Sequence, residues 1–132
     1  MPTKVLDAYA LLAFLLDEPG ADTVRGLLID AVAGKDALAM SVVNLGEVWY
    51  AIARAISPAA ADQYLQRIRG MGVEIVDADW EITRQAALFK MPGKISYADC
   101  FAAALAKRLD AEVVTGDKEF KVLEGQIGIV WL

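Results

Sequence analysis

Short apolar runs alternate along this chain with longer stretches in which apolar residues recur every three or four positions. The short runs, which predict strands, cover residues 4–7, 38–40, 73–76, 112–115 and 128–132. The longer stretches predict helices over residues 8–16, 21–32, 41–56, 58–70, 79–89 and 96–109. Short, mainly apolar strands that alternate with helices are typical of a parallel sheet with helices on both faces. The pattern therefore predicts an α/β fold.

The length and composition of the chain favour one compact domain. Its 132 residues include no internal repeat and no linker, so we expect a single domain over residues 1–132. The longest apolar run near the start, residues 8–16, is well short of the roughly 20 residues that a membrane-spanning helix needs. Neither a basic cluster before it nor a cleavage site after it suggests a signal peptide. With Cys100 as the single cysteine, these features favour a cytoplasmic location.

The residue types that the chain lacks exclude several kinds of catalytic site. It has no histidine, which excludes a histidine base, a Ser-His-Asp triad and histidine-ligated zinc. A bound metal ion would need oxygen ligands, which favours Mg²⁺ or Mn²⁺. The net charge of -5 argues against a protein that coats nucleic acid, because phosphate binding needs positive charge. It does not argue against a nuclease whose acidic centre is filled by metal ions.

Four acidic residues are predicted to meet at one edge of the sheet. Asp7 ends the first strand, and Asp117 follows the strand over residues 112–115. Asp99 and Glu47 lie in the first and second turns of helices, and the helix of Glu47 follows the second strand. Because parallel strands end at the same edge, and functional sites gather there, we expect the four side chains to converge.

Each of these acids also has a purely structural interpretation. Asp7 and Asp117 could cap the helix or turn that follows them. Asp99 lies three residues after Ser96, which matches a capping box, and Glu47 could be a solvated residue on an exposed helix face. However, uncharged residues cap equally well, whereas clustered carboxylates repel one another and lose hydration. The joint pattern therefore favours a cation site that could serve the cleavage of phosphodiesters or of phosphate monoesters.

Four segments resemble, in order, the motif blocks of PIN domains. They are VLDAYALL at residues 5–12, SVVNLGEV at 41–48, SYADCFAAALA at 96–106 and VVTGDKEF at 113–120. The nearest subgroup is the VapC-type toxins of prokaryotic toxin–antitoxin pairs. The resemblance implies a three-layer α/β/α sandwich with a five-stranded parallel sheet, and Mg²⁺- or Mn²⁺-dependent endoribonuclease activity. It also implies a homodimer held by a VapB-like antitoxin.

The resemblance also assigns roles to single residues. The catalytic and metal-binding positions match Asp7, Glu47, Asp99 and Asp117. Positions that support the site match Thr115, Ser41 and Asn44.

Other charged residues near this edge are assigned from their place in the chain. Lys4, Lys94 and Lys118 lie in loops or at strand ends near this edge, where they could meet RNA phosphates or be ordinary surface lysines. Glu119 is expected to be a solvated helix residue, although it could add a further carboxylate.

Two other functions stay open on the sequence alone. A phosphatase of the haloacid-dehalogenase type also has an acid after its first strand, but it needs a second aspartate where this chain has Tyr9. A receiver-like domain fails similarly, because the chain lacks the acidic pair beside the first strand. A catalytically inactive protein-interaction module is the second alternative, and the four intact acids argue against it.

Overall fold

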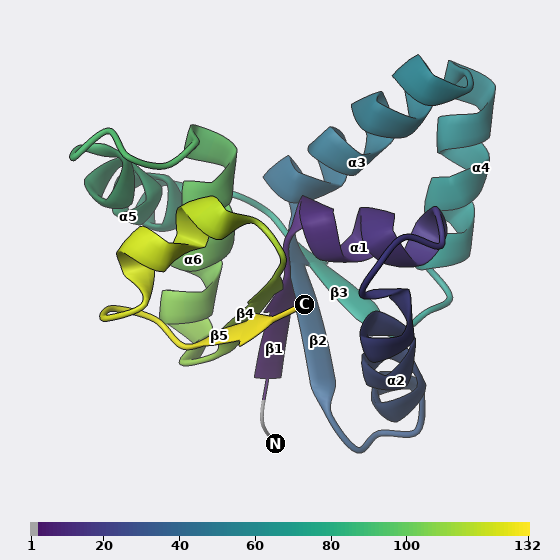
Figure 1. Cartoon of the computed structure of the whole chain (residues 1–132), viewed down its shortest axis with the longest axis horizontal. Coiled ribbons are helices and arrows are strands. Elements are labelled where there is room, and N and C mark those ends of the chain that lie inside the picture. Colours follow the sequence, from purple (N-terminus) through teal and green to yellow (C-terminus); the bar gives the residue numbers. More distant parts are fainter. Residues whose placement is uncertain (1–2) are drawn as a thin grey trace.

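The computed structural model describes residues 3–132. All five strands are parallel and form one sheet in the order β3-β2-β1-β4-β5. The strands are β1 (Thr3–Leu6), β2 (Ala37–Ser41), β3 (Val73–Val76), β4 (Glu112–Thr115) and β5 (Ile129–Trp131). The first strand is therefore the central one, with β2 on one side and β4 on the other (Figure 1).

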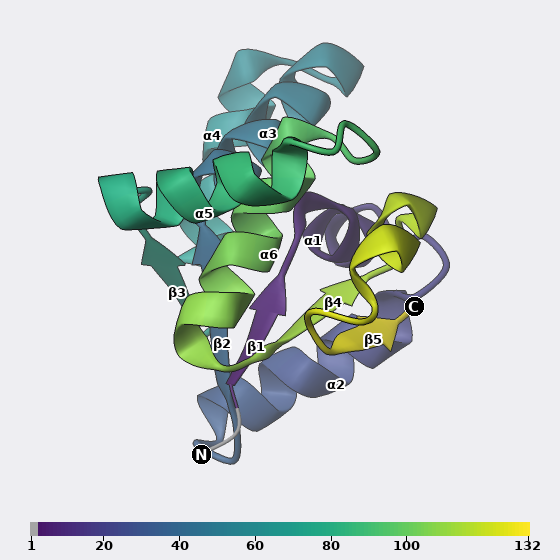
Figure 2. The same cartoon turned by 90° about the vertical axis from the view of Figure 1, so that its left-hand side faces the viewer.

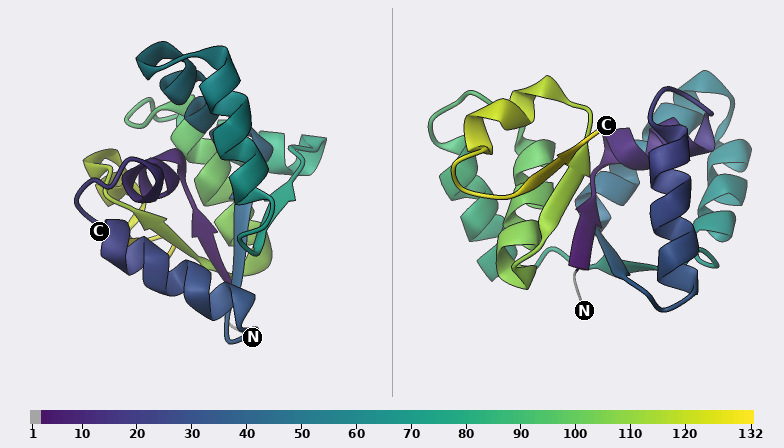
Figure 3. Two further views of the ribbon diagram at one scale, coloured as in Figure 1. Left: turned by 90° about the vertical axis from the view of Figure 1, so that its right-hand side faces the viewer. Right: turned by 60° about the horizontal axis from the view of Figure 1, so that its bottom comes forward.

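Helices cover both faces of the sheet, so the fold has three layers (Figure 3). The helices are α1 (Ala8–Leu15), α2 (Ala21–Val32), α3 (Val42–Ala55), α4 (Pro58–Ile68), α5 (Trp80–Lys90) and α6 (Tyr97–Leu109), with a 3₁₀ helix η1 (Lys118–Leu123). One face packs against α5, α6 and η1, and the other packs against α1, α2, α3 and α4. The α/β sandwich with a five-stranded parallel sheet is confirmed.

Burial on both faces explains why the strands are apolar runs. In β1, Val5 belongs to the core beside α6 and Leu6 to the core beside α2, and neither residue is exposed to solvent. In neighbouring β4, Val113 belongs to the core beside α6 and Val114 to the core beside α2. Since successive side chains of a strand point to opposite faces, a strand between two helical layers needs apolar residues at every position.

Local capping explains where several helices begin. Ser41, Ser57, Asp79 and Ser96 each accept a backbone N–H of the following turn through a side-chain oxygen. Pro58 occupies the first position of α4, where its missing N–H costs nothing. Three predicted helices begin one residue before the observed ones, because Ser41, Asp79 and Ser96 are N-caps and not the first helical residues.

Helix α6 lies deep in the molecule, alongside β1 (Figure 2). Every residue from 99 to 106 is buried, and four of these eight are alanine. Small side chains let a helix approach a sheet and a neighbouring helix closely. This approach brings the first turn of α6, which carries Asp99, beside the end of β1.

No helix among residues 3–132 is long and apolar enough to cross a membrane.

Candidate metal centre

Asp7 sits directly after β1, and it is 1% exposed. Its Oδ1 accepts the backbone N–H of Ala10 at 2.9 Å, and its Oδ2 accepts the hydroxyl of Thr115 at 2.5 Å. Asp7 thus caps α1 and, through its second oxygen, contacts the end of β4. The structural and the functional interpretation of this residue are therefore compatible.

Thr115 joins the first and the last acid of the set. Its hydroxyl donates to Asp7 and accepts the backbone N–H of Asp117 at 2.9 Å. The side chain is completely buried at the end of β4. One hydroxyl group therefore fixes the Asp7 carboxylate relative to the turn that carries Asp117.

Asp99 faces the same edge from the first turn of α6. It is 7% exposed, and its Oδ2 has no hydrogen-bond partner among the described residues. One carboxylate oxygen each from Asp99, Asp117 and Glu119 lies within 4.8 Å of the others. A buried carboxylate oxygen without a donor is costly, and it is a group that a cation would satisfy.

Glu47 is half-buried, so the solvated interpretation of this residue is wrong. Asn44, one turn earlier in α3, donates its side-chain amide to Glu47 Oε1 at 2.9 Å. The same amide donates to the carbonyl of Ala98 at 3.0 Å, which ties α3 to the start of α6. Asn44 therefore orients Glu47 and links its helix to the residue before Asp99.

The four carboxylates share one electrostatic environment. Burial raises the pKa of Asp7 to about 7, despite the hydrogen bonds from Thr115 and Ala10 that oppose the shift. Burial also raises the pKa of Asp99 to about 8, and the nearby carboxylate of Asp117 adds to this shift. Burial and the charge of Asp117 raise the pKa of Glu47 in the same way. Such a cluster retains protons near neutral pH unless a cation compensates its charge.

The other predicted residues are placed as follows. Ser41 ends β2, and its hydroxyl accepts the N–H of Val43 at 3.2 Å, so its observed contact is a helix cap. Lys118 follows Asp117 and is exposed, and exposed Lys94 lies in the loop before α6. Lys4 was placed wrongly: it lies early in β1, toward the opposite edge of the sheet, where it pairs with Asp36 at 2.7 Å.

One contact at this edge, between Tyr9 and Gly116, does not follow from the sequence pattern. A Cβ atom at Gly116 would overlap the Tyr9 ring, so this ring lies directly on the turn between β4 and Asp117. Tyr9 is 46% exposed and lies two residues after Asp7. The signal in the sequence is the glycine between Thr115 and Asp117. Its φ angle is not positive in the structure, so space for the Tyr9 ring explains the glycine better than backbone conformation does.

We predict that Gly116→Ala reduces the free energy of unfolding by about 1–3 kcal/mol, because the added methyl group displaces the Tyr9 ring. In a Tyr9→Ala background the same change should be nearly neutral, since the ring is gone. Urea denaturation of the two single variants and the double variant measures this coupling. Equal costs of Gly116→Ala in both backgrounds would show that the ring is not the obstacle.

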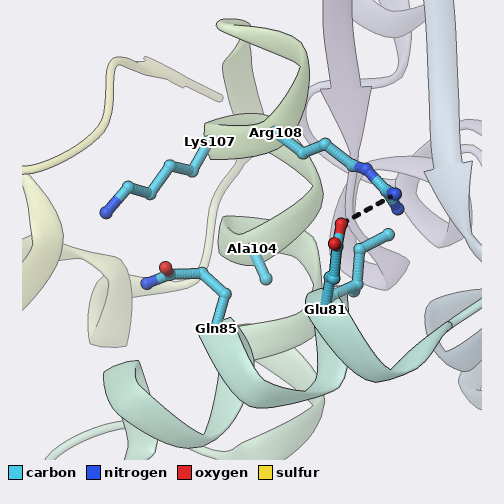
Figure 4. A pocket seen from close by; sticks show the side chains of 6 residues that line it. Glu81, Gln85, Ala104, Lys107 and Arg108 are labelled. Atoms are coloured by element: carbon cyan, nitrogen blue, oxygen red, sulfur yellow. Dashed lines mark hydrogen bonds and ion pairs between the residues drawn. The ribbon is translucent and has the colours of Figure 1, made fainter.

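A hollow lies between α5 and α6, toward the end of α6 opposite to Asp99 (Figure 4). Arg108 turns toward Glu81 at 3.5 Å and also pairs with Asp79 at 2.8 Å. Lys107 lies over the ring of Phe89. Both basic groups of this hollow are thus engaged within the protein, and the carboxylate edge remains the candidate site.

Comparison with known proteins agrees with this fold. No curated protein matches the sequence. A structure of VapBC2 from Rickettsia felis bound to a promoter DNA fragment is 20% identical, covers 98% of both chains and has a TM-score of 0.77. DNA-bound VapBC from Salmonella typhimurium is 18% identical, with 98% of both chains covered and a TM-score of 0.76. VapC20 of Mycobacterium tuberculosis, described as a Sarcin-Ricin loop cleaving toxin, is 18% identical over 90% of this chain and 93% of that chain, with a TM-score of 0.72.

At these identities the structural matches show a shared fold. Membership is shown by the sequence, because the model of the PIN domain matches residues 4–126, which is most of the chain. The chain therefore belongs to the PIN domain family.

Proposed function

We propose that this protein is a Mg²⁺- or Mn²⁺-dependent endoribonuclease, the toxin of a type II toxin–antitoxin pair that acts in the cytoplasm. The observation that carries the proposal is a set of four carboxylates at the carboxyl edge of the sheet in a PIN fold. These are Asp7, Glu47, Asp99 and Asp117.

The donor set fits a hard divalent cation. All four side chains offer carboxylate oxygens, and such cations take oxygen ligands. The Oδ2 of Asp99 has no hydrogen-bond partner among the described residues, and burial raises the pKa of Asp7 and Asp99. Both features mean that the ionised carboxylates need a compensating cation. Neighbouring neutral groups hold the acids in place, Thr115 for Asp7 and Asn44 for Glu47.

Under this proposal, the four acids bind the cation, and neighbouring groups orient the acids. A divalent cation in such a site attracts the scissile phosphate and lowers the pKa of a bound water. Thr115 and the N–H of Ala10 fix the Asp7 carboxylate, so it does not turn away from the site. Asn44 fixes Glu47 in the same way. The chain has no histidine, so no imidazole can act as the base. A site that uses metal-bound water does not need one.

RNA is the substrate that the family and the surroundings favour. Exposed Lys118 follows Asp117 directly and offers a positive charge to a phosphate. The test is cleavage of a labelled RNA with Mg²⁺, with Mn²⁺ and with chelator alone. Hydrolysis of a generic phosphate monoester without RNA cleavage would instead support the phosphatase alternative, which Tyr9 in place of a second aspartate disfavours.

A VapB-like antitoxin is the partner that we propose for this toxin. The structural neighbours include VapBC complexes. An apolar hollow lies between α1, α2 and the end of α4, and it is lined in part by Phe14, Ile29 and Val32. Ile29 is 61% exposed and Val32 is 68% exposed, and together with Phe14 they line one apolar surface that a partner could cover.

We predict that Ile29→Asp weakens antitoxin binding at least about tenfold, because it places a charge in a desolvated contact. RNA cleavage by the free protein should be unaffected. The matched control is Ile56→Asp, the same change at an exposed isoleucine that ends α3 outside the hollow. Copurification and titration with the proposed VapB-like antitoxin measure the effect. Undiminished binding of Ile29→Asp would exclude the hollow as the antitoxin surface.

A further inference from the structure

The start of α6 contains half of a capping box. Ser96 is the N-cap, and its hydroxyl accepts the backbone N–H of Asp99 at 3.3 Å. In a complete capping box the side chain three residues after the cap returns a bond to the N–H of the cap residue. Asp99 occupies that position. Its carboxylate would therefore be expected to turn back toward the N–H of Ser96.

Glu119 takes this place instead. The N–H of Ser96 donates to Glu119 Oε1 at 2.8 Å, although the two residues are far apart in the chain. The N–H of Glu119 in turn donates to Asp117 Oδ1 at 2.9 Å. Asp99 is left with a buried Oδ2 that has no hydrogen-bond partner among residues 3–132.

The charges near Asp99 oppose the position that it occupies. Asp117 and Asp7 both repel its carboxylate, and burial removes its hydration. A return to the N–H of Ser96 would relieve part of this cost, because a helix N-terminus favours a carboxylate. The Asp99 carboxylate cannot form this bond when another acceptor already occupies the N–H of Ser96. Glu119 is that acceptor.

We propose that Glu119 completes the capping box of α6 in place of Asp99, and so keeps the Asp99 carboxylate turned into the cation site. The inference rests on the proposed function, since it concerns how that site is held. Glu119 is thus a positioning residue, and it acts through Ser96. Glu119 is exposed in η1, as expected, and its carboxylate also accepts the backbone N–H of Ser96.

Substitution separates this role from direct coordination of the cation. Glu119→Gln keeps an oxygen that accepts the N–H of Ser96 but loses the negative charge. Glu119→Ala loses both. We expect the Mn²⁺ dissociation constant to rise about 10–100-fold in Glu119→Ala and to stay within about threefold of wild type in Glu119→Gln.

The measurement is calorimetric titration of each purified protein with Mn²⁺, together with urea denaturation to show that each variant is folded. Glu124→Ala is the matched control, because it removes an exposed carboxylate at the end of η1. It should bind Mn²⁺ as wild type does. If Glu119 only stabilised the helix, Glu119→Ala would reduce the free energy of unfolding and leave Mn²⁺ affinity unchanged, which would overturn the inference.

The remaining outcomes are equally decisive. Equal weakening in Glu119→Gln and Glu119→Ala would overturn the inference in favour of direct coordination by Glu119. Normal Mn²⁺ binding by wild type, by Glu119→Gln and by Glu124→Ala, with weak binding by Glu119→Ala alone, supports it. A wild-type protein that does not bind Mn²⁺ would overturn the cation site itself, and this inference with it.

Discussion

Asp99→Asn is expected to abolish RNA cleavage, by at least about 100-fold, and to leave the fold intact. Asparagine has nearly the volume of aspartate, so the substitution opens no cavity at this buried position. It removes the negative charge and one oxygen from a carboxylate that lies within 4.8 Å of its acidic neighbours. The loss of charge also relieves repulsion from Asp117, so the metal-free variant should be at least as stable as wild type.

A matched control for this experiment lies in the same helix. Asp110 ends α6 in the left-handed conformation that asparagine also tolerates, and it is exposed. Asp110→Asn is therefore the same chemical change outside the site, and it should cleave RNA as wild type does. Cleavage of labelled RNA and the urea midpoint of each protein are the measurements. Full activity in a folded Asp99→Asn protein would contradict the proposed ribonuclease site.

Mn²⁺ is expected to raise the melting temperature by about 5–10 °C when its concentration is about 100 times its dissociation constant. A cation that binds only the folded chain stabilises it, and here it also offsets repulsion among buried carboxylates. The gain should be larger at pH 8 than at pH 6, because protons compete with the cation for the carboxylates.

The metal-free protein should show the opposite dependence on pH. Asp7 and Asp99 have an ordinary pKa of 3.8 when unfolded, but about 7 and about 8 in the folded chain. A raised carboxyl pKa means that ionisation disfavours the fold. The penalty is absent below about pH 4 and grows as the pH rises toward 8. Stability in chelator should therefore fall between pH 5 and pH 8.

Controls for this slope come from the same chain. Asp36 and Asp79 have lowered pKa values, so they are ionised in both states across this range and add nothing to the slope. Asp99→Asn should have a shallower slope than wild type, since one titrating group is removed. Urea denaturation in chelator at several pH values measures both. Stability that rises with pH in chelator, or that ignores Mn²⁺ at every pH, would count against the site.

The secondary structure could be predicted because its causes are local. The apolar runs around Val5 and Val113 predict strands buried on both faces, and that is where β1 and β4 lie. Residues that cap helices, such as Ser57 before Pro58, predict their starts to within a residue. The edge of the sheet that carries Asp7 also follows from the sequence, because parallel strands share their direction.

The homodimer, the RNA substrate and the catalytic roles stay predictions, because they depend on surfaces and chemistry outside the single chain. The phosphate contacts of Lys94 and Lys118 also stay predictions. The wrong placement of Lys4 has a simple cause. A residue near the start of a strand and one at its end lie at opposite edges of a sheet, and Lys4 pairs with Asp36 at the far edge.

The sequence by itself determined the succession of strands and helices along the chain and most of the capping residues, and it predicted four candidate acids. Only the tertiary structure decided which group each acid meets: Thr115 for Asp7 and Asn44 for Glu47. It also left the Oδ2 of Asp99 without a hydrogen-bond partner among residues 3–132, and placed Glu119 on the N–H of Ser96. Periodicity and capping depend on residues within one or two turns, so they can be read along the chain. A hydrogen bond between distant segments depends on how closely the elements pack. The apolar pattern shows which face of an element is buried, but it does not show which other element packs against that face.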